Sequence, residues 1–175
     1  IEKTPQEAAT WLDAVIRSPH RLPAMLWGPP GVGKSSLVSQ AAERAGLESI
    51  PLELAVMPPQ ELLGLPYVES GSSCYAKPSF WPDDGEGVLI LEDLPHAVPA
   101  VQAMGMSLIL EGRVGPHVLP DGWQVIGTGN RVTDGAGAFR MPTATASRMV
   151  HISVGADTAH WREWALGKNI QEDIL

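Results

Sequence analysis

Five short apolar segments are spread along the chain, and they predict the strands of a sheet. They span residues 23–27, 50–54, 87–93, 123–130 and 150–154. In the segment 87–93 apolar residues follow one another without polar alternation, which is typical of strands buried on both faces of a parallel sheet. The segment 50–54 is the weakest because Pro51 has no N–H group for the sheet. The pattern predicts an α/β protein with a central, mostly parallel, five-stranded sheet.

Helical spacing of apolar residues predicts helices between these strands. Thr4 followed by Pro5 and Glu7 is typical of a helix start, and this helix is expected to end near residues 18–19. Further helices are predicted over residues 36–45, 58–63 and 95–112, and a last one starts at residue 161. We therefore expect one α/β domain over residues 1–160, followed by a separate helical segment over 161–175.

Two hairpins are predicted to project from this domain. Residues 64–82 contain two short strands around the turn residues 70–73, and residues 113–120 form a second, shorter hairpin. The aromatic residues of the first insert are Tyr67, Tyr75, Phe80 and Trp81. These side chains either face a partner or pack within the insert, and the sequence leaves both interpretations open.

One loop matches the pattern G-x-x-x-x-G-K-[ST], the phosphate-binding loop called Walker A. Its glycines let backbone N–H groups curl around a phosphate, and the helix that follows points its N-terminus at the anion. Lys34 is placed to reach the β- and γ-phosphates of a nucleotide, and the Ser35 hydroxyl to bind Mg²⁺. The nucleotide-binding residues predicted from this loop are Gly28, Pro29, Pro30, Gly31, Val32, Gly33, Lys34, Ser35 and Ser36.

Two acidic residues, Glu92 and Asp93, end the predicted strand that begins at residue 87. Parallel α/β sheets bind ligands at the carboxyl ends of their strands. In a phosphate-loop protein this is the Walker B position, where one carboxylate holds Mg²⁺ and the other orients the attacking water. We therefore predict that Glu92 and Ser35 bind the metal. Asp93 is then the catalytic carboxylate that orients the attacking water.

Composition narrows the class of protein. The 175 residues are 44% hydrophobic and 18% charged, as expected for one globular domain. No apolar run reaches the roughly 18 residues of a membrane helix, and no signal peptide opens the sequence, so we expect a cytoplasmic protein without a membrane partner. A net charge of −8 argues against a surface built to grip nucleic acid, and the single cysteine, Cys74, fits a reducing compartment.

The order of the motifs resembles the AAA+ ATPases, and most of all their MoxR branch. The similarity covers residues 22–164 and is strongest over residues 26–36, 88–101, 112–134 and 140–152. It implies a three-layer P-loop NTPase sandwich of the AAA+ type, with ATP and Mg²⁺ as ligands. It also implies a ring, usually a hexamer, that couples ATP hydrolysis to remodelling or activating a partner protein. In this branch the partner often carries a von Willebrand factor A domain.

The same resemblance implies roles for two further residues. Asn130 matches sensor 1, which reads the γ-phosphate and positions water, although it could instead cap a turn. Arg148 matches the arginine finger, which acts on ATP held by the neighbouring subunit, although it could instead form a structural ion pair. Arg131 and Arg140 compete for the finger role, but neither directly precedes the last strand. The insert at residues 64–82 matches the helix-2 insert that lines one face of the ring.

Two features depart from the family pattern. The family usually ends its Walker B strand with Asp-Glu, whereas this chain has Glu92-Asp93. The shorter acid in the position that orients water draws its carboxylate back by roughly 1 Å, and errors of about 1 Å can slow a reaction on the order of a hundredfold. This predicts tight Mg·ATP binding with slow hydrolysis. The helical lid with its sensor 2 arginine is missing or barely begun over residues 161–175.

Three functions follow from these features. The leading hypothesis is a ring-forming ATPase that remodels a protein client. The second is a scaffold that assembles on ATP but hydrolyses it poorly, and the order of the two acids favours it. The third is a small-molecule kinase, which is disfavoured because a kinase has no need of an arginine from a neighbouring subunit.

Overall fold

A five-stranded parallel sheet forms the centre of the molecule. The computed structural model describes residues 2–131, 141, 143–157, 162, 165 and 166. The strands are β1 (Ala24–Trp27), β2 (Glu48–Glu53), β5 (Gly87–Glu92), β8 (Trp123–Gly129) and β9 (Val150–Ser153). Their order across the sheet is β2-β5-β8-β1-β9, and every neighbouring pair is parallel. The predicted parallel sheet is confirmed.

The position of each strand explains its composition. The seven residues of β8, in the middle of the sheet, are all buried, as are the first five of β5. Strand β2 lies at the edge, where it pairs with β5 alone and where Pro51 stands opposite Ile90. A proline is tolerated at an edge because its missing N–H would have faced solvent. The strand also begins at Glu48, two residues earlier than the apolar pattern predicts.

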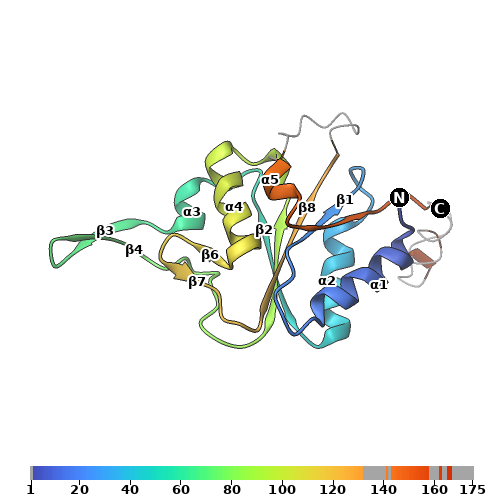
Figure 1. Ribbon diagram of the computed structural model, residues 1–175, viewed down its shortest axis with the longest axis horizontal. Coiled ribbons are helices and arrows are strands. Elements are labelled where there is room, and N and C mark those ends of the chain that lie inside the picture. Colours follow the sequence, from blue (N-terminus) through green and yellow to red (C-terminus); the bar gives the residue numbers. More distant parts are fainter. Residues whose placement is uncertain (1, 132–140, 142, 158–161, 163–164, 167–175) are drawn as a thin grey trace.

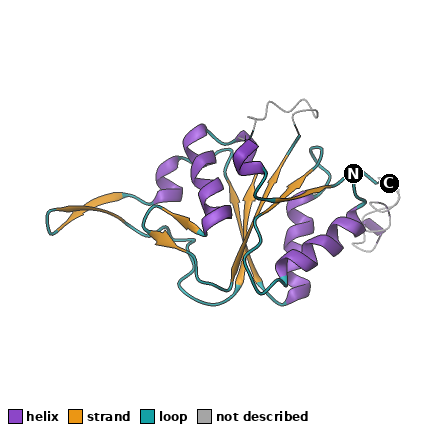
Figure 2. Cartoon of the chain, in the orientation of Figure 1, coloured by secondary structure: helices purple, strands orange, loops and turns teal. Residues whose placement is uncertain are grey.

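Helices cover both faces of the sheet and make a three-layer sandwich (Figures 1 and 2). Helices α1 (Pro5–Ile16) and α2 (Lys34–Ala45) pack on one face. Helices α3 (Pro59–Leu63), α4 (Pro99–Glu111) and α5 (Thr143–Ala146) lie on the other. Successive strand residues alternate between the two cores, because side chains along a strand point to opposite faces. In β5, for example, Val88 and Ile90 join the α1–α2 core, whereas Leu89 and Leu91 join the core with α4.

The helix ends follow local sequence signals. The predicted helix start at Thr4 is confirmed, and Thr4 and Glu7 form a capping box there. The Thr4 Oγ1 accepts from the Glu7 N–H at 3.3 Å, and the Glu7 Oε2 accepts from the Thr4 N–H at 2.9 Å. Helix α2 ends at Gly46, as predicted, in the left-handed conformation that favours glycine. Helix α4 begins later than predicted because residues Leu94–His96 form a separate 3₁₀ turn, η1, after β5.

Both predicted hairpins are present. Strands β3 (Pro66–Glu69) and β4 (Ser72–Tyr75) are antiparallel and project from the body as an arm, residues 66–75 (Figure 1). Ser70 and Gly71 turn the chain at its tip, with φ of 49° and 79°, the left-handed pair that tight hairpins prefer. The second hairpin is short, β6 (Arg113–Val114) with β7 (His117–Val118).

The four aromatic residues of the insert separate into two pairs. Phe80 and Trp81 pack against the body, and Trp81 is only 5% exposed, with its Nε1 donating to the Val118 carbonyl. These two residues therefore pack, although against the body as well as within the insert. Tyr67 and Tyr75 are exposed on the arm.

Several expectations lie outside the described residues. They include Arg140 and nearly all of the segment 161–175. Within that segment Arg162, Ala165 and Leu166 are helical, in agreement with the predicted last helix.

Candidate functional site

The predicted site residues converge on the carboxyl edge of the sheet. Strands β5, β8 and β1 are neighbours in the sheet and run in the same direction. Glu92 ends β5, Asn130 follows β8, and Gly28 follows β1. Three segments that are far apart in the sequence therefore present their polar residues at one edge, where ligands bind in open α/β sheets.

The backbone of the loop at residues 28–36 has the shape that its glycines allow. A Cβ at Gly28 would lie 2.7 Å from the Val154 carbonyl oxygen, so this position has no room for a side chain. Gly31 and Gly33 have φ of 76° and 85°, and Gly33 leads directly into α2. The 12-residue helix thus begins at the loop, where its first N–H groups and its dipole favour an anion.

Lys34, the charged residue of the loop, is buried, with 8% of its surface exposed. Its Nζ donates to the carbonyl oxygens of Gly28 and Pro29, both at 3.1 Å, and to the Asn130 Oδ1 at 2.6 Å. A buried ammonium needs such acceptors because taking it out of water is costly. The contact with Asn130 joins two residues that the sequence placed in the same site on separate grounds.

The two acids at the end of β5 differ in their surroundings. Glu92 lines an open depression of about 560 Å³ between α2 and β2, together with Ser35. The other residues that line it are Ser36, Ser39, Gln40, Glu43, Ser49 and Pro51. Asp93 lies on the turn into η1, where its Oδ1 is 3.9 Å from the His96 Nδ1 and its side chain is 43% exposed. Glu92 therefore shares the depression with Ser35, the serine that the motif predicts to bind Mg²⁺.

Thr128 is a site residue that the sequence analysis missed. It is 1% exposed on β8, and its Oγ1 accepts from the Asp93 N–H at 3.4 Å. The contact links the acid-bearing turn to the strand that leads to Asn130. A polar residue inside an apolar strand segment is the only signal in the sequence that could have indicated it.

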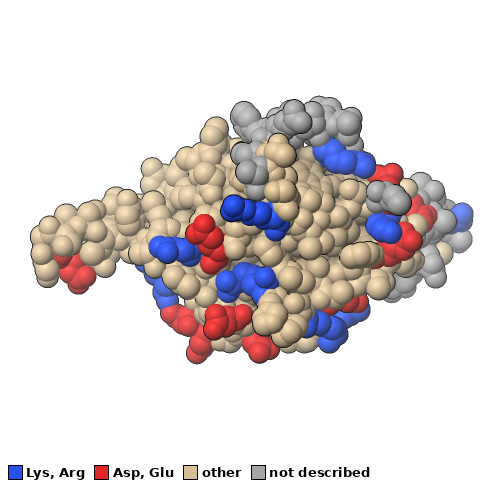
Figure 3. All heavy atoms as spheres, viewed as in Figure 1, with Lys and Arg blue, Asp and Glu red and all other residues tan. Residues whose placement is uncertain are grey.

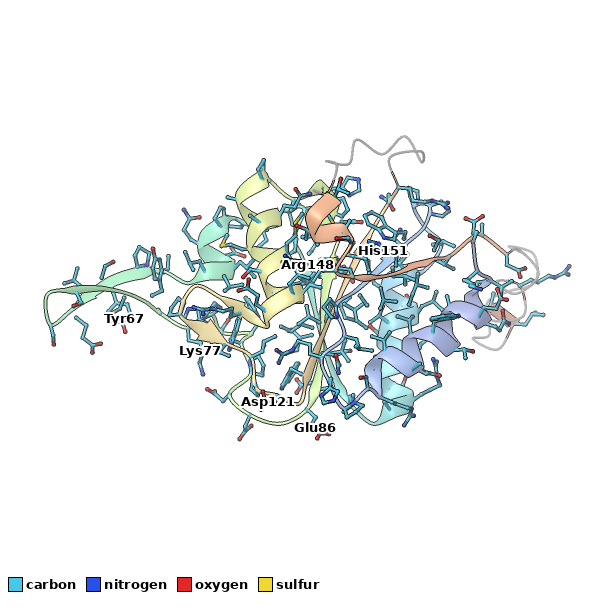
Figure 4. All side chains as sticks on the ribbon, in the orientation of Figure 1. Tyr67, Lys77, Glu86, Asp121, Arg148 and His151 are labelled. Atoms are coloured by element: carbon cyan, nitrogen blue, oxygen red, sulfur yellow. The ribbon has the colours of Figure 1, made fainter. Side chains whose placement is uncertain are left out.

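Arg148 lies apart from the loop, just after α5, and its side chain is exposed (Figure 4). Its backbone N–H donates to the Thr145 carbonyl at 3.1 Å. Of its two competitors, Arg131 is held by the Glu2 carboxylate at 2.9 Å, and Arg140 is outside the described residues. The role of Arg148 as an arginine finger stays a prediction.

The arm at residues 66–75 is poor in charge on the face seen in Figure 3, apart from Glu69. It exposes apolar and aromatic side chains instead, namely Leu65 at its base, Tyr67, Val68 and Tyr75. The Glu69 carboxylate raises the pKa of the Tyr67 phenol, and the Cys74 thiol adds to this effect. A tyrosine hydroxyl is neutral at physiological pH even without this shift, and it can act as a hydrogen-bond donor.

The donor set at the edge of the sheet suits a magnesium nucleotide. Mg²⁺ prefers oxygen ligands and is usually bound by one or two protein groups together with waters and phosphates. The Ser35 hydroxyl and the Glu92 carboxylate offer such oxygens. Among the described residues no group of three or more His, Cys, Asp or Glu could hold a metal on its own.

No helix among these residues is both long and apolar enough to cross a membrane.

Comparison with solved structures identifies the fold. A candidate ATPase of Cytophaga hutchinsonii superposes with a TM-score of 0.62 at 17% identity, over 95% of this chain and 51% of that one. NtrX of Brucella abortus in complex with ATP gives 0.55 at 19% identity, over 87% of this chain and 35% of that one. A RuvB variant of Thermotoga maritima gives 0.55 at 18%, over 87% and 44%. Together with the order of the strands, these likenesses show that the chain shares their fold, a three-layer α/β sandwich around a parallel sheet.

Sequence comparison adds one relative. The chain is 29% identical over 168 residues to Midasin of Giardia intestinalis, an alignment that covers 87% of this chain and 3% of that protein. No family model matches the sequence. The chain thus spans about half or less of the solved proteins named here and a small part of Midasin.

Proposed function

We propose that this chain binds ATP with Mg²⁺ at the loop of residues 28–36 and hydrolyses it within a ring of subunits. The observation that carries this proposal is the meeting of Lys34, Asn130 and Glu92 at one edge of the sheet, next to the N-terminus of α2. The likeness to NtrX, which was solved with ATP, supports the choice of nucleotide.

Each residue has a task in this proposal. The N–H groups from Gly31 to Ser35 and the Lys34 ammonium would bind the β- and γ-phosphates. Ser35 and Glu92 would hold Mg²⁺, which neutralises phosphate charge when bound. Asn130, which already contacts the ammonium, would hold the γ-phosphate and the attacking water, and Asp93 would orient that water.

The binding step is tested by Lys34→Ala. We expect at least a roughly hundredfold weaker affinity for Mg·ATP, because the substitution removes a charge-assisted contact with the phosphates. Lys77→Ala is a matched control, since Lys77 is an exposed lysine paired with Asp83 on a surface loop. Isothermal titration calorimetry measures the affinity of both variants for Mg·ATP. An unchanged affinity in Lys34→Ala would show that the loop is not the binding site.

The assembly step rests on Arg148. We propose that it acts on ATP held by the neighbouring subunit, in a ring like those of the MoxR branch, usually hexameric. Its exposed side chain, which is accessible to a neighbouring subunit, supports action in trans. The ring would then drive remodelling of a protein client, with a von Willebrand factor A domain as one candidate and the apolar arm at residues 66–75 as its contact surface.

A mixture of two inactive variants tests action in trans. Arg148→Ala subunits keep an intact pocket, and Lys34→Ala subunits keep an intact arginine. We expect the mixture to hydrolyse ATP at least about tenfold faster than either variant alone, because some interfaces join both intact halves. Native mass spectrometry establishes that the two variants assemble together. Co-assembled mixtures that gain no activity would contradict action in trans.

A second function, an ATP-binding scaffold with impaired hydrolysis, is favoured by one observation. Asp93 is the shorter of the two acids, and its carboxylate lies on the turn beside His96. Phosphate release measured at saturating Mg·ATP separates the two functions. The scaffold requires tight binding without turnover, whereas the ATPase requires both.

A further inference from the structure

Trp27 and His151 form a side-chain contact that the proposed function does not use. Trp27 is the last residue of β1, directly before the first glycine of the loop. Its indole Nε1 donates to the His151 Nδ1 at 2.8 Å, and the two rings are stacked with centroids 6.0 Å apart and planes 21° apart. The contact joins the strand that carries the loop to the edge strand β9.

The second ring nitrogen of His151 is also bound. Its Nε2 lies 2.7 Å from the carbonyl oxygen of Ala146, the last residue of α5. Because an indole N–H can only donate, the Nδ1 of His151 must be the acceptor, and the ring proton therefore resides on Nε2. The neutral imidazole thus accepts from Trp27 and donates to Ala146, so both of its nitrogens are used.

The Ala146 carbonyl belongs to the turn that carries Arg148. It also accepts from the Met149 N–H at 3.2 Å, which closes the four-residue turn 146–149 with Arg148 as its third residue. The Met149 side chain is buried in the core below. Figure 4 shows the labelled Arg148 and His151 where α5 leads into β9. The imidazole therefore ties the arginine-bearing turn to the strand of the loop.

The indole is itself fixed by the polar edge of the sheet. Its ring lies 3.5 Å from the point that a Cβ of Gly129 would occupy, and the ring of Pro95 lies 2.5 Å from the same point. Gly129 precedes Asn130, and Pro95 belongs to the turn η1 after Asp93. Trp27 therefore packs where the ends of β1, β5 and β8 meet.

We propose that His151 is a positioning residue for Arg148. The chain of contacts from Trp27 through His151 to Ala146 holds the turn 146–149 at a fixed place relative to the sheet, so that Arg148 is presented to the nucleotide of the neighbouring subunit. This inference rests on the proposed function of Arg148 in trans. It deepens that function by naming the side chain that sets the geometry.

The test places His151→Ala in one or the other partner of the mixture of Arg148→Ala and Lys34→Ala subunits. In the Lys34→Ala subunit, which supplies the arginine, we expect the restored turnover to fall roughly tenfold, because a misplacement of about 1 Å is costly. In the Arg148→Ala subunit, which has no arginine to position, we expect the restored turnover to stay within about twofold, a range of roughly 0.4 kcal/mol. The dependence on the partner separates positioning from a general structural effect.

Rescue provides the second readout. In the Lys34→Ala subunit, His151→Gln should recover most of the restored turnover, because an amide can accept from Trp27 and donate to Ala146. His20→Ala in the same subunit is the control, since His20 is an exposed histidine outside this site. Equal losses from His151→Ala in both partners, or no loss in either, would overturn the inference. A starting mixture without restored turnover would instead contradict action in trans, and the positioning role would fall with it.

Discussion

Asp93 gives a physical reason for the unusual order of the two acids. It is one of two non-glycine residues in the described part of the chain with a positive φ, 50°, the other being Ser70 at the arm tip. Aspartate visits the left-handed region more readily than most residues, because its short side chain can hydrogen-bond locally. A glutamate at this position would have no such advantage. The backbone at the end of β5 therefore suits the sequence Glu92-Asp93.

Asp93→Glu tests whether the reach of the acid limits hydrolysis. We expect turnover to rise by roughly tenfold, because the longer side chain returns the carboxylate toward the attacking water. We also expect the free energy of unfolding to fall by about 1 kcal/mol, because glutamate is less compatible with a positive φ. Phosphate release and urea unfolding measure the two effects.

The control for this substitution is Asp121→Glu, on an exposed turn away from the site. It should leave both quantities unchanged. Slower turnover in Asp93→Glu would mean that the local backbone has already adapted to the shorter acid, and the case for an impaired scaffold would lose its main support.

For single residues, the sequence predicts those that belong to a motif. It does not predict side-chain contacts between residues that only the fold brings together. The phosphate loop and the strand-end acids were predictable because phosphate binding requires that backbone shape and those side chains in a set order. The contact from Lys34 to Asn130 joins residues 96 apart in the sequence. Neither it nor the contact of Trp27 with His151 leaves a local pattern.

At the scale of elements, the periodicity of apolar residues predicts the strands and helices. Their exact bounds and contacts depend on the neighbouring elements. Pro51 weakened the prediction of β2, yet the strand forms because the edge of the sheet tolerates a missing N–H. Helix α4 starts at Pro99 because η1 intervenes. Trp81 was a candidate for the partner surface, but its indole N–H reaches Val118 of the other hairpin, and local sequence does not show that contact.

Gly64, just before the arm, and Gly71, at its tip, should respond differently to replacement by alanine. An added Cβ at Gly64, with φ of 92°, would lie 1.8 Å from the Ala76 carbonyl oxygen, whereas Gly71 at the tip, with φ of 79°, has nothing within 4 Å. We expect Gly64→Ala to lower the free energy of unfolding by about 3 kcal/mol or more, through backbone strain and overlap together. Gly71→Ala should cost about 1 kcal/mol, from φ alone.

Urea unfolding of both variants gives the comparison. Equal costs would mean that the base of the arm can shift to accept a side chain, and that the arm is less firmly joined to the body than its contacts indicate.

At the scale of the whole molecule, the sequence predicts that the sheet is parallel but does not specify which strands are neighbours. Apolar continuity marks β1, β5 and β8 as buried strands. The order β2-β5-β8-β1-β9 depends on how the crossover helices pack on the two faces, and no local pattern in the sequence specifies it. The same order places the carboxyl ends of β1, β5 and β8 side by side, so the strand order also forms the candidate site.

This strand order also decides what a break in the arm would do. Every strand residue of the arm except the half-buried Cys74 is exposed, so a protease should cut there first. Cleavage near Ser70 leaves β1 and β2 on one fragment and β5, β8 and β9 on the other. In the order β2-β5-β8-β1-β9 the strands of the two fragments interleave, so neither fragment can leave without unfolding the sheet.

We expect the nicked protein to migrate as one species on a native gel and its fragments to separate only in denaturant. Separation of the fragments without denaturant would show that the interleaved strands do not hold them together. The arm is accordingly the position at which this domain could be expressed as two complementing fragments.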